Sequence, residues 1–196
     1  RPIRSQLCER ITDPQTILEK YGGEAHVQYK YDGFRVQIHK DGSNVRLFSR
    51  NLEETTPMFP DIVMGALKQI KAKSAILDSE ALAYNPESEE FLPFQETTKR
   101  RRKYGIEEMQ KKLPLKAFVF DIMYLNGKSL MDTPLRERMK KLAEVIEGDE
   151  VLTSPPKAGR QGSGGASYNN SERSAEQVLI EQPGEFVKDV DRLNEL

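Results

Sequence analysis

The chain has 196 residues, of which 37% are hydrophobic and 31% are charged, and its formal net charge is −1. This composition excludes an acidic disordered tail, and the lack of an apolar run near the roughly 20 residues needed to cross a bilayer excludes a membrane protein. Its single cysteine, Cys8, excludes an internal disulfide, and the first residues do not form a secretory signal, so we expect an intracellular location, cytoplasmic or, in a eukaryote, nuclear.

The N-terminal third predicts one short helix followed by strands. Asp13-Pro14 supplies an N-cap and a first-turn proline, and Gly22-Gly23 supplies a stop, so a helix is expected between them. Apolar and polar residues then alternate over 24–30 and 34–39, which is typical of strands. Asp41-Gly42 is a turn signal, after which 45–48 can return antiparallel.

Helices and strands alternate irregularly through the middle of the chain. Hydrophobic spacing, proline starts and turn residues predict a helix from Pro60, a strand over 75–84 with a turn at 85–88, a helix from Glu96 to Tyr104, a strand over 117–124 ending at Asn126-Gly127, and a helix from Thr133-Pro134. No strict strand-helix-strand rhythm is present. We therefore predict an α+β domain built on antiparallel sheet.

The composition changes after Pro155-Pro156. Gly, Ser and Asn dominate residues 155–174, which indicates a loop, an insertion or a linker. A short helix over 174–182 and a last strand over 184–190 are expected beyond it. We divide the chain into a core over 1–154, this Gly/Ser/Asn-rich segment over 155–174, and a C-terminal part over 175–196.

The stretch Lys30-Tyr31-Asp32-Gly33-Phe34-Arg35 places a lysine at a strand end, a turn at Asp32-Gly33 and an arginine in the next strand. A lysine that attacks phosphate must be neutral, although its ordinary pKa is about 10.4, so it needs burial or nearby positive charge. Arg35 and a divalent metal could supply that charge and hold phosphates. The alternative is a plain hairpin turn with solvated charges.

These residues resemble the covalent nucleotidyltransferases, and within them the ATP-dependent DNA ligases of the archaeal and eukaryotic type. Five segments carry the likeness in a consistent order: 1–4, 30–35, 48–51, 76–81 and 118–122, with 125–130 continuing it. The resemblance implies an adenylation domain with antiparallel sheets flanked by helices around a nucleotide cleft, similar to the ATP-grasp arrangement. It also implies that Lys30 carries AMP covalently.

Three further roles are implied by the resemblance. Glu80 would lie near the ribose and a metal, Arg50 would contact phosphate or nicked DNA, and Phe120 would stack on adenine. Each has a plainer alternative: a buried ion pair for Glu80, an exposed strand-end charge for Arg50, and a core position for Phe120 on a face shared with Phe118 and Ile122.

Gln28 precedes Lys30 by two residues, so the alternation of a strand places both side chains on one face. In the family this position often holds a glutamate that accepts a hydrogen bond from the adenine amino group. The Gln28 amide can also accept, but without charge. Adenine recognition should persist, with altered selectivity.

Basic residues cluster between Lys99 and Lys116, where eight basic residues accompany two acidic ones. We expect Arg100, Arg101 and Arg102 to contact the DNA backbone, with a solvated helix face as the alternative. No base-reading motif accompanies them, which is consistent with recognition of a nick by shape.

The C-terminal part departs from the family pattern. The family motif Glu-Gly-x-x-x-Lys has Pro183 in place of its glutamate here, with Glu181 and Glu185 nearby and Lys188 at the lysine position. We retain Lys188 as a candidate phosphate ligand. A later lysine-rich motif, an N-terminal DNA-binding domain and an oligonucleotide-binding domain are not visible, so we expect these domains on a parent ligase.

The leading functional hypothesis is a monomeric DNA ligase domain that uses ATP with Mg²⁺ or Mn²⁺ and transfers AMP from Lys30 to the 5′-phosphate of nicked double-stranded DNA. One alternative keeps this chemistry for an RNA ligase or a capping-type nucleotidyltransferase. Another is a non-catalytic nucleotide- or DNA-binding fragment. Sealing of nicked DNA against nicked RNA separates the first two, and a covalent adduct excludes the third.

Overall fold

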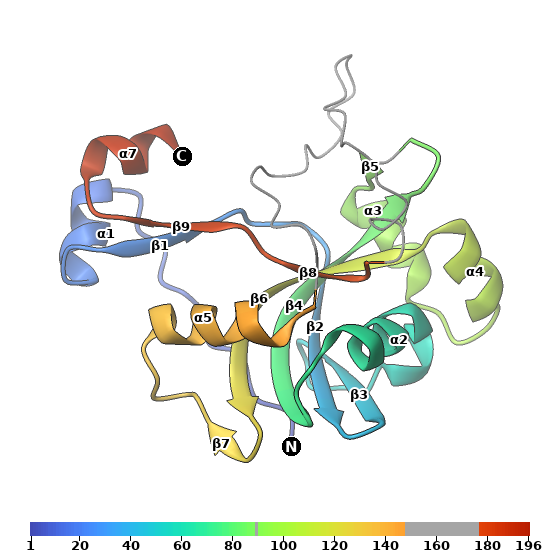
Figure 1. Ribbon diagram of the computed structural model, residues 1–196. Coiled ribbons are helices and arrows are strands. Elements are labelled where there is room, and N and C mark those ends of the chain that lie inside the picture. The colour runs from blue at the N-terminus through green and yellow to red at the C-terminus, as the bar shows by residue number, and fades with distance from the viewer. Residues whose placement is uncertain (89, 148–176) are drawn as a thin grey trace.

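The computed structural model describes residues 1–88, 90–147 and 177–196 (Figure 1). The elements, in chain order, are α1 (Pro14–Lys20), β1 (Ala25–Gln28), β2 (Phe34–Asp41), β3 (Asn44–Ser49), η1 (Thr56–Met58), α2 (Pro60–Gln69), β4 (Ser74–Asn85), β5 (Glu90–Phe91), α3 (Phe94–Thr97), η2 (Thr98–Arg100), α4 (Ile106–Lys112), β6 (Leu115–Leu125), β7 (Lys128–Ser129), α5 (Leu135–Val145), β8 (Leu179–Glu181), β9 (Gly184–Val187) and α7 (Val190–Glu195).

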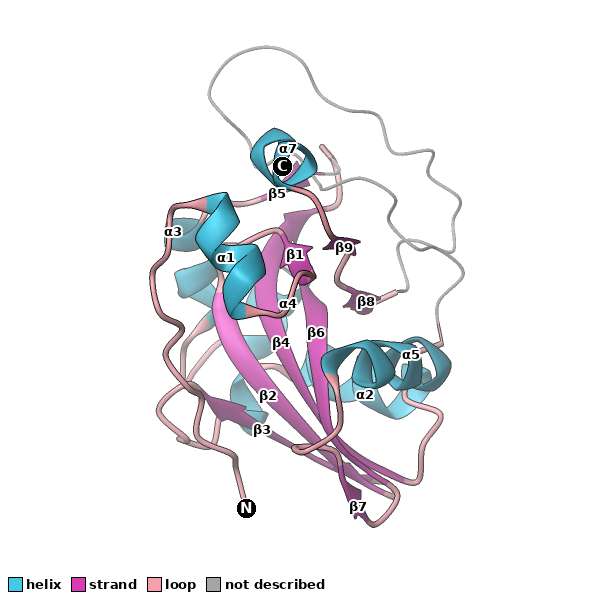
Figure 2. Cartoon of the chain, turned by 90° about the vertical axis from the view of Figure 1, so that its left-hand side faces the viewer, coloured by secondary structure: helices cyan, strands magenta, loops and turns pink. Residues whose placement is uncertain are grey.

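A seven-stranded sheet forms the body of the molecule. Its strands run in the order β3-β2-β4-β6-β7, with β5 added on β4 and β8 on β6. All of these pairings are antiparallel except that between β6 and β8. The α+β prediction with antiparallel sheet is thereby confirmed. Helices α2 and α5 cover one face of this sheet, as the side view in Figure 2 shows.

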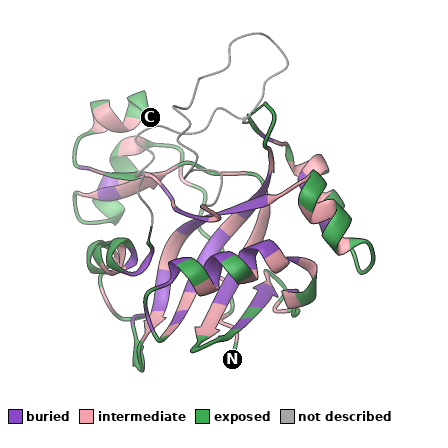
Figure 3. Ribbon diagram, turned by 45° about the vertical axis from the view of Figure 1, so that its right-hand side comes forward, coloured by how far each residue is buried: buried purple, intermediate pink, exposed green. Residues whose placement is uncertain are grey.

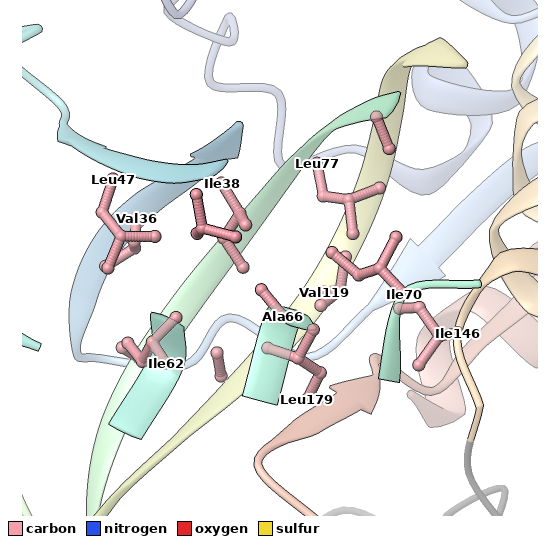
Figure 4. Packing of buried hydrophobic residues seen from close by; sticks show 14 of the residues in the cluster. Val36, Ile38, Leu47, Ile62, Ala66, Ile70, Leu77, Val119, Ile146 and Leu179 are labelled. Carbon is pink, nitrogen blue, oxygen red and sulfur yellow. The ribbon is translucent and has the colours of Figure 1, made fainter. Parts of the chain in front are cut away.

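The core lies between the sheet and these two helices. In β2 and β4 every second residue points into it, including Val36 and Ile38 of β2 and Leu77 and Ala81 of β4, all at most 1% exposed. Figure 4 shows the apolar side of α2 packed against these strands, and Figure 3 shows buried residues concentrated along the sheet. Burial of this apolar area is the main stabilising term of the fold. The alternate residues of β2 and β4 point to the opposite face of the sheet.

The strand before Lys30 belongs to a different sheet from the strand after it. β1 pairs antiparallel with β9, from the far end of the chain, whereas β2 pairs with β3 and β4. The predicted turn at Asp32-Gly33 therefore does not close a hairpin. Residues 29–33 instead connect the two-stranded sheet to the large sheet, a pairing that local alternation could not reveal.

Two predicted helices are wrong in part. The helix expected over 96–104 is replaced by α3 and η2, and residues 101–104 are not helical. The helix expected over 174–182 is wrong at Leu179–Glu181, which form β8. The side chain of Gln69, from α2, stabilises this short strand because it accepts from the Leu179 amide at 2.8 Å and donates to the Leu179 carbonyl at 2.8 Å.

The predicted last strand is shorter than expected, since β9 ends at Val187 and α7 begins at Val190. The Gly/Ser/Asn-rich segment over 155–174 lies outside the described residues. None of the helices within the described ranges combines the length and the apolarity that crossing a membrane requires.

Candidate active site

The face of the large sheet opposite α2 and α5 carries a cleft of 740 Å³. The cleft gathers predicted site residues from five separate stretches of the chain. Its lining includes Gln28, Lys30, Asp32, Gly33, Arg35, Arg50, Glu80, Phe120 and also Arg101. Lys188 is the one predicted nucleotide ligand that does not line this cleft.

Lys30 lies on the connection between the two sheets, which is anchored on either side of it. The Gln182 amide donates to the Tyr29 carbonyl at 2.7 Å, and the Tyr31 ring stacks on Phe118 with ring centroids 4.2 Å apart. The Lys30 side chain is exposed to the cleft, and no described residue forms an ion pair with it. The Lys30 side chain, on an anchored backbone segment, is therefore accessible to a ligand in the cleft.

Gly33 brings the connection into contact with the backbone of β4. A Cβ atom at this position would lie 2.3 Å from the Ala81 carbonyl oxygen, so no larger residue fits without displacing one of the two segments. The Gly33 amide donates to the Glu80 carboxylate at 3.1 Å. The glycine therefore fixes the distance between the lysine segment and the strand that carries Glu80.

Glu80 is a partly buried carboxyl group without an ion pair among the described residues. Burial raises its pKa to about 7, against the opposing effects of the Gly33 amide and of the charges on Lys30 and Arg35. The alternative of a structural ion pair at Glu80 is therefore wrong for the described part of the chain. A cation bound beside this carboxyl group would stabilise its ionised form.

Arg35 is oriented by Asp78, which the sequence reasoning missed. The Arg35 guanidinium donates to both carboxylate oxygens of Asp78, with Nε at 3.0 Å from Oδ1. The Asp78 side chain is 3% exposed, and burial raises its pKa while the Arg35 guanidinium opposes that rise. Alternation in the strand was the available signal, because it places Asp78 on the face of Glu80.

Phe120 and Phe118 occupy different environments. Phe118 is fully buried in a small cluster with Leu82, Phe91 and Ile180, whereas Phe120 is partly exposed and lines the cleft. The Arg35 guanidinium carbon lies 5.3 Å from the centroid of the Phe120 ring.

A shift in the pairing of β4 with β6 explains this position. Val119 pairs with Ser79 and Asp121 with Asp78, which leaves Phe120 without a partner at a bulge. The bulge also breaks the expected common face, since Ile122 points into the main core.

The basic segment divides into a structural and an exposed part. Arg100 is 1% exposed, and its guanidinium donates to Asp61 at 2.7 and 3.1 Å and to the Leu113 carbonyl at 2.6 Å. The prediction that Arg100 contacts DNA is therefore wrong: a buried, paired guanidinium cannot reach a phosphate. Arg101 and Arg102 are exposed, and Arg101 pairs with Glu53 at 3.0 Å beside the cleft.

Lys188 lies past the end of β9, away from the cleft. Its side chain is 76% exposed and its nitrogen is 3.6 Å from Glu24. Glu185 pairs with Arg192, and burial raises the pKa of Glu181. The phosphate role of Lys188 is contradicted by this placement. Gln182, which sequence reasoning did not select, lines the cleft instead.

The N-terminal segment also reaches this face. The backbone of Ile3 exchanges two hydrogen bonds with the Gln37 side chain, at 2.7 and 3.0 Å. Gln6, Leu7 and Cys8 then line the cleft. Sequence reasoning assigned no site role to Gln6, Leu7 or Cys8, because no motif or periodicity marks these three residues.

The described residues contain no cluster of three or more His, Cys, Asp or Glu side chains placed to hold a metal ion. Mg²⁺ is commonly held by one or two carboxylates together with substrate phosphates and waters. The isolated Glu80 carboxyl group fits that mode, in which the nucleotide supplies most of the ligands.

Known proteins similar to this chain are DNA ligases. The model of a family described as "ATP dependent DNA ligase domain" matches residues 5–160. The chain is 48% identical over 155 residues to a "Probable DNA ligase" of Dictyoglomus turgidum, covering 79% of this chain and 26% of that protein. It is 46% identical over 158 residues to "DNA ligase 2" of Thermofilum pendens, covering 80% of this chain and 26% of that protein.

The fold has a counterpart among solved structures. The ATP-dependent DNA ligase of bacteriophage T7, in complex with ATP, superimposes with a TM-score of 0.51 at 14% identity over 93% of this chain and 55% of that one. The chain spans only about a quarter of the two DNA ligases named above, 26% of the length of each. On the match over residues 5–160, the chain belongs to the ATP-dependent DNA ligase domain family.

Proposed function

We propose that this chain is the adenylation domain of a DNA ligase and that Lys30 is its nucleophile. The observation that carries the proposal is the convergence in one cleft of Arg35, Glu80 and Phe120 with an exposed lysine that has no ion pair among the described residues. These groups offer a nucleophile, a phosphate ligand, a carboxylate and an aromatic surface, which together match a nucleoside triphosphate. The "DNA ligase" names of the relatives support the same substrate class.

In the proposed step the neutral Lys30 nitrogen attacks the α-phosphorus of ATP. A P–N bond forms, the bond from the α-phosphorus to the bridging oxygen breaks, pyrophosphate leaves, and the nitrogen loses a proton. Arg35, held by Asp78, would stabilise charge that develops on the phosphate oxygens. Phe120 would stack on the base.

A divalent ion, Mg²⁺ or Mn²⁺, would offset phosphate charge and polarise the α-phosphate when bound. Glu80 is the residue proposed to hold it together with the nucleotide phosphates. Burial raises the pKa of Glu80 to about 7, and a cation bound beside it would lower that pKa and favour the ionised form.

The proposed acceptor of AMP is the 5′-phosphate of a nick in double-stranded DNA, inside the cell. Arg50, Arg101 and Arg102 are exposed on or beside the cleft, where they can contact the backbone of such a duplex. In this proposal, further domains of the parent ligase would also bind the DNA. We propose that the domain acts as a monomer.

The test is a two-step labelling experiment. The protein is incubated with ATP labelled on the α-phosphate and a divalent metal, freed of nucleotide, and then offered nicked DNA or nicked RNA in separate reactions. We expect label on the denatured protein and its transfer to DNA. Transfer to RNA alone would support an RNA ligase, and binding of ATP without covalent label would support a non-catalytic module.

A further inference from the structure

Helix α5 contacts the two-stranded sheet of β1 and β9 through the side chain of Arg136. This arginine lies in the first turn of α5, and its Nη2 atom is 2.6 Å from the carboxylate of Glu24, the residue before β1. Its guanidinium carbon lies 3.9 Å from the centroid of the Phe186 ring, which belongs to β9. In Figure 1 the N-terminal end of α5 accordingly lies below β1 and β9. One side chain therefore ties α5 to both segments that build this sheet.

The Phe186 ring extends this contact to β1. Phe186 and His26 are cross-strand partners, and their rings stack with centroids 4.4 Å apart. Gly184 leaves the space that the imidazole needs, because a Cβ atom there would lie 2.4 Å from the His26 Nε2 atom. A guanidinium over an aromatic ring is attracted by the electrons of that ring. Arg136 is thus held by the charge of Glu24 and by a ring that β1 supports.

These contacts are too exposed to contribute much to the stability of the fold. The Arg136 and Glu24 side chains are 48% and 28% exposed, and ion pairs at such positions are weak. Lys188 makes a longer contact with Glu24, at 3.6 Å, but it follows β9 directly and so does not reach α5. What the Arg136 contacts fix is the position of the two-stranded sheet against the helix.

The position of the two-stranded sheet bears on Lys30. The chain passes between the two sheets at 29–33 and 182–183, and the Gln182 amide joins these passages by donating to the Tyr29 carbonyl at 2.7 Å. Glu24 and Lys30 lie beyond opposite ends of β1. The two-stranded sheet is therefore held by the passages at the end next to Lys30 and by Arg136 toward the other end.

The groups proposed to hold ATP and the group proposed to attack it belong to different parts of the fold. Arg35, Glu80 and Phe120 lie in β2, β4 and β6 of the large sheet, whereas Lys30 follows β1. A tilt of the two-stranded sheet would move Lys30 relative to the α-phosphate and leave the ATP-binding groups in place. A displacement of about 1 Å between reacting groups slows a reaction by on the order of a hundredfold.

We propose that Arg136 is a positioning residue for the attack of Lys30 on ATP, because it holds the two-stranded sheet on α5 and thereby sets the place of the lysine. This inference rests on the proposed function of the cleft. Arg136 is not among the residues that line the cleft. Its removal should therefore lower the rate of adenylation and leave the affinity for ATP unchanged.

The experiment measures the affinity for α,β-methylene ATP, which cannot release pyrophosphate, and the rate of covalent AMP labelling at saturating ATP. Wild type is compared with Arg136→Ala, with Arg136→Lys, and with the control Lys140→Ala, which removes the same charge from an exposed position further along α5. Arg136→Ala should bind the analogue as wild type does and label about tenfold or more slowly. Arg136→Lys keeps a cation for Glu24 and Phe186 and should restore most of the rate, and the control should match wild type.

Amide hydrogen exchange gives a second reading that does not depend on activity. Arg136→Ala should speed exchange in β1 and β9 and leave β2 and β4 unchanged, because only the two-stranded sheet loses a support. Phe186→Leu removes the ring below the guanidinium and should act in the same direction in both assays. It provides the test if Arg136→Ala does not fold.

The inference is overturned if Arg136→Ala labels at the wild-type rate, if it loses rate and affinity in equal measure, or if Arg136→Lys is as slow as Arg136→Ala. Unchanged exchange in β1 and β9 would also overturn it. Labelling of wild type separates this failure from failure of the proposed function. A labelled wild type with an unaffected Arg136→Ala removes only the role of Arg136, whereas a wild type that binds the analogue and never gains AMP removes both.

Discussion

The Glu80 carboxyl group makes stability depend on pH in a defined direction. Its pKa rises from an ordinary value near 4.5 to about 7 on folding, so the folded state holds this proton more tightly than the unfolded chain does. The free energy of unfolding contributed by Glu80 therefore falls as the pH rises from 4.5 to 7 and stays low above that range.

We predict that Glu80→Gln stabilises the nucleotide-free protein at pH 8 relative to wild type, by at most about 3 kcal/mol, and has little effect at pH 4. The glutamine oxygen can still accept from the Gly33 amide, so the hydrogen bond is kept. Denaturant unfolding at both pH values measures the effect, with Glu107→Gln on the exposed side of α4 as a control. Equal stabilities of variant and wild type at pH 8 would refute the claim that the ionised Glu80 carboxylate destabilises the nucleotide-free protein.

Phe118 and Phe120 should respond differently to truncation although they lie two residues apart. Phe118→Ala removes a fully buried ring and should lower the free energy of unfolding by about 3–5 kcal/mol. Phe120→Ala removes a cleft-lining ring and should weaken ATP binding by about tenfold while costing less stability. Thermal unfolding and ATP titration of both variants separate the two roles. A larger fall in melting temperature for Phe120→Ala would place that ring in the core.

At the scale of elements, η2 ends between arginines with different roles: Arg100, inside η2, is buried, whereas Arg101 and Arg102, after it, are exposed. Arg100→Ala would leave Asp61 buried without its partner, and the free energy of unfolding should fall by about 3–5 kcal/mol. The double variant Arg101→Gln, Arg102→Gln should fold normally, because both side chains are exposed and the surface pair with Glu53 contributes little.

The same double variant should weaken binding to nicked DNA and flatten its dependence on salt, since fewer counterions are released. Fluorescence anisotropy over a series of salt concentrations measures this effect. Lys111→Gln with Lys112→Gln, which removes an equal charge from exposed positions of α4, is the matched control. If the two double variants lose affinity equally, residues 101 and 102 act only through net charge.

Elements with strong periodicity were predictable from sequence, and those defined by distant partners were not. β4 and β6 are long and rich in apolar residues, and each is followed by a turn signal, so residues 75–84 and 117–124 were identified as strands. β8 has three residues and is held by Gln69 from α2, more than 100 positions away in the chain. Such a strand has no local signal. The burial of Arg100 depends in the same way on Asp61, and its basic neighbours concealed it.

At the scale of the whole molecule, the sequence motifs indicated which residues meet but not how they are held. The cleft joins Lys30, Arg35, Glu80 and Phe120, as their resemblance to a known family implied. The residues that hold them in place were not selected from the sequence, because Asp78 and Gln182 act on Arg35 and Tyr29, which are distant in the chain. Lys188 was misplaced since its position was inferred from spacing within an altered motif, whereas β9 ends before it.

The central claim is that Lys30 carries AMP, and the intact mass of the protein after incubation with ATP and Mg²⁺ or Mn²⁺ tests it most directly. We predict a single AMP on wild type, formed without DNA. Lys30→Arg should show no adduct, because a guanidinium stays protonated and cannot attack, while its retained charge should preserve part of the ATP binding. Wild type that binds ATP but gains no AMP, or Lys30→Arg that still gains it, would contradict the account.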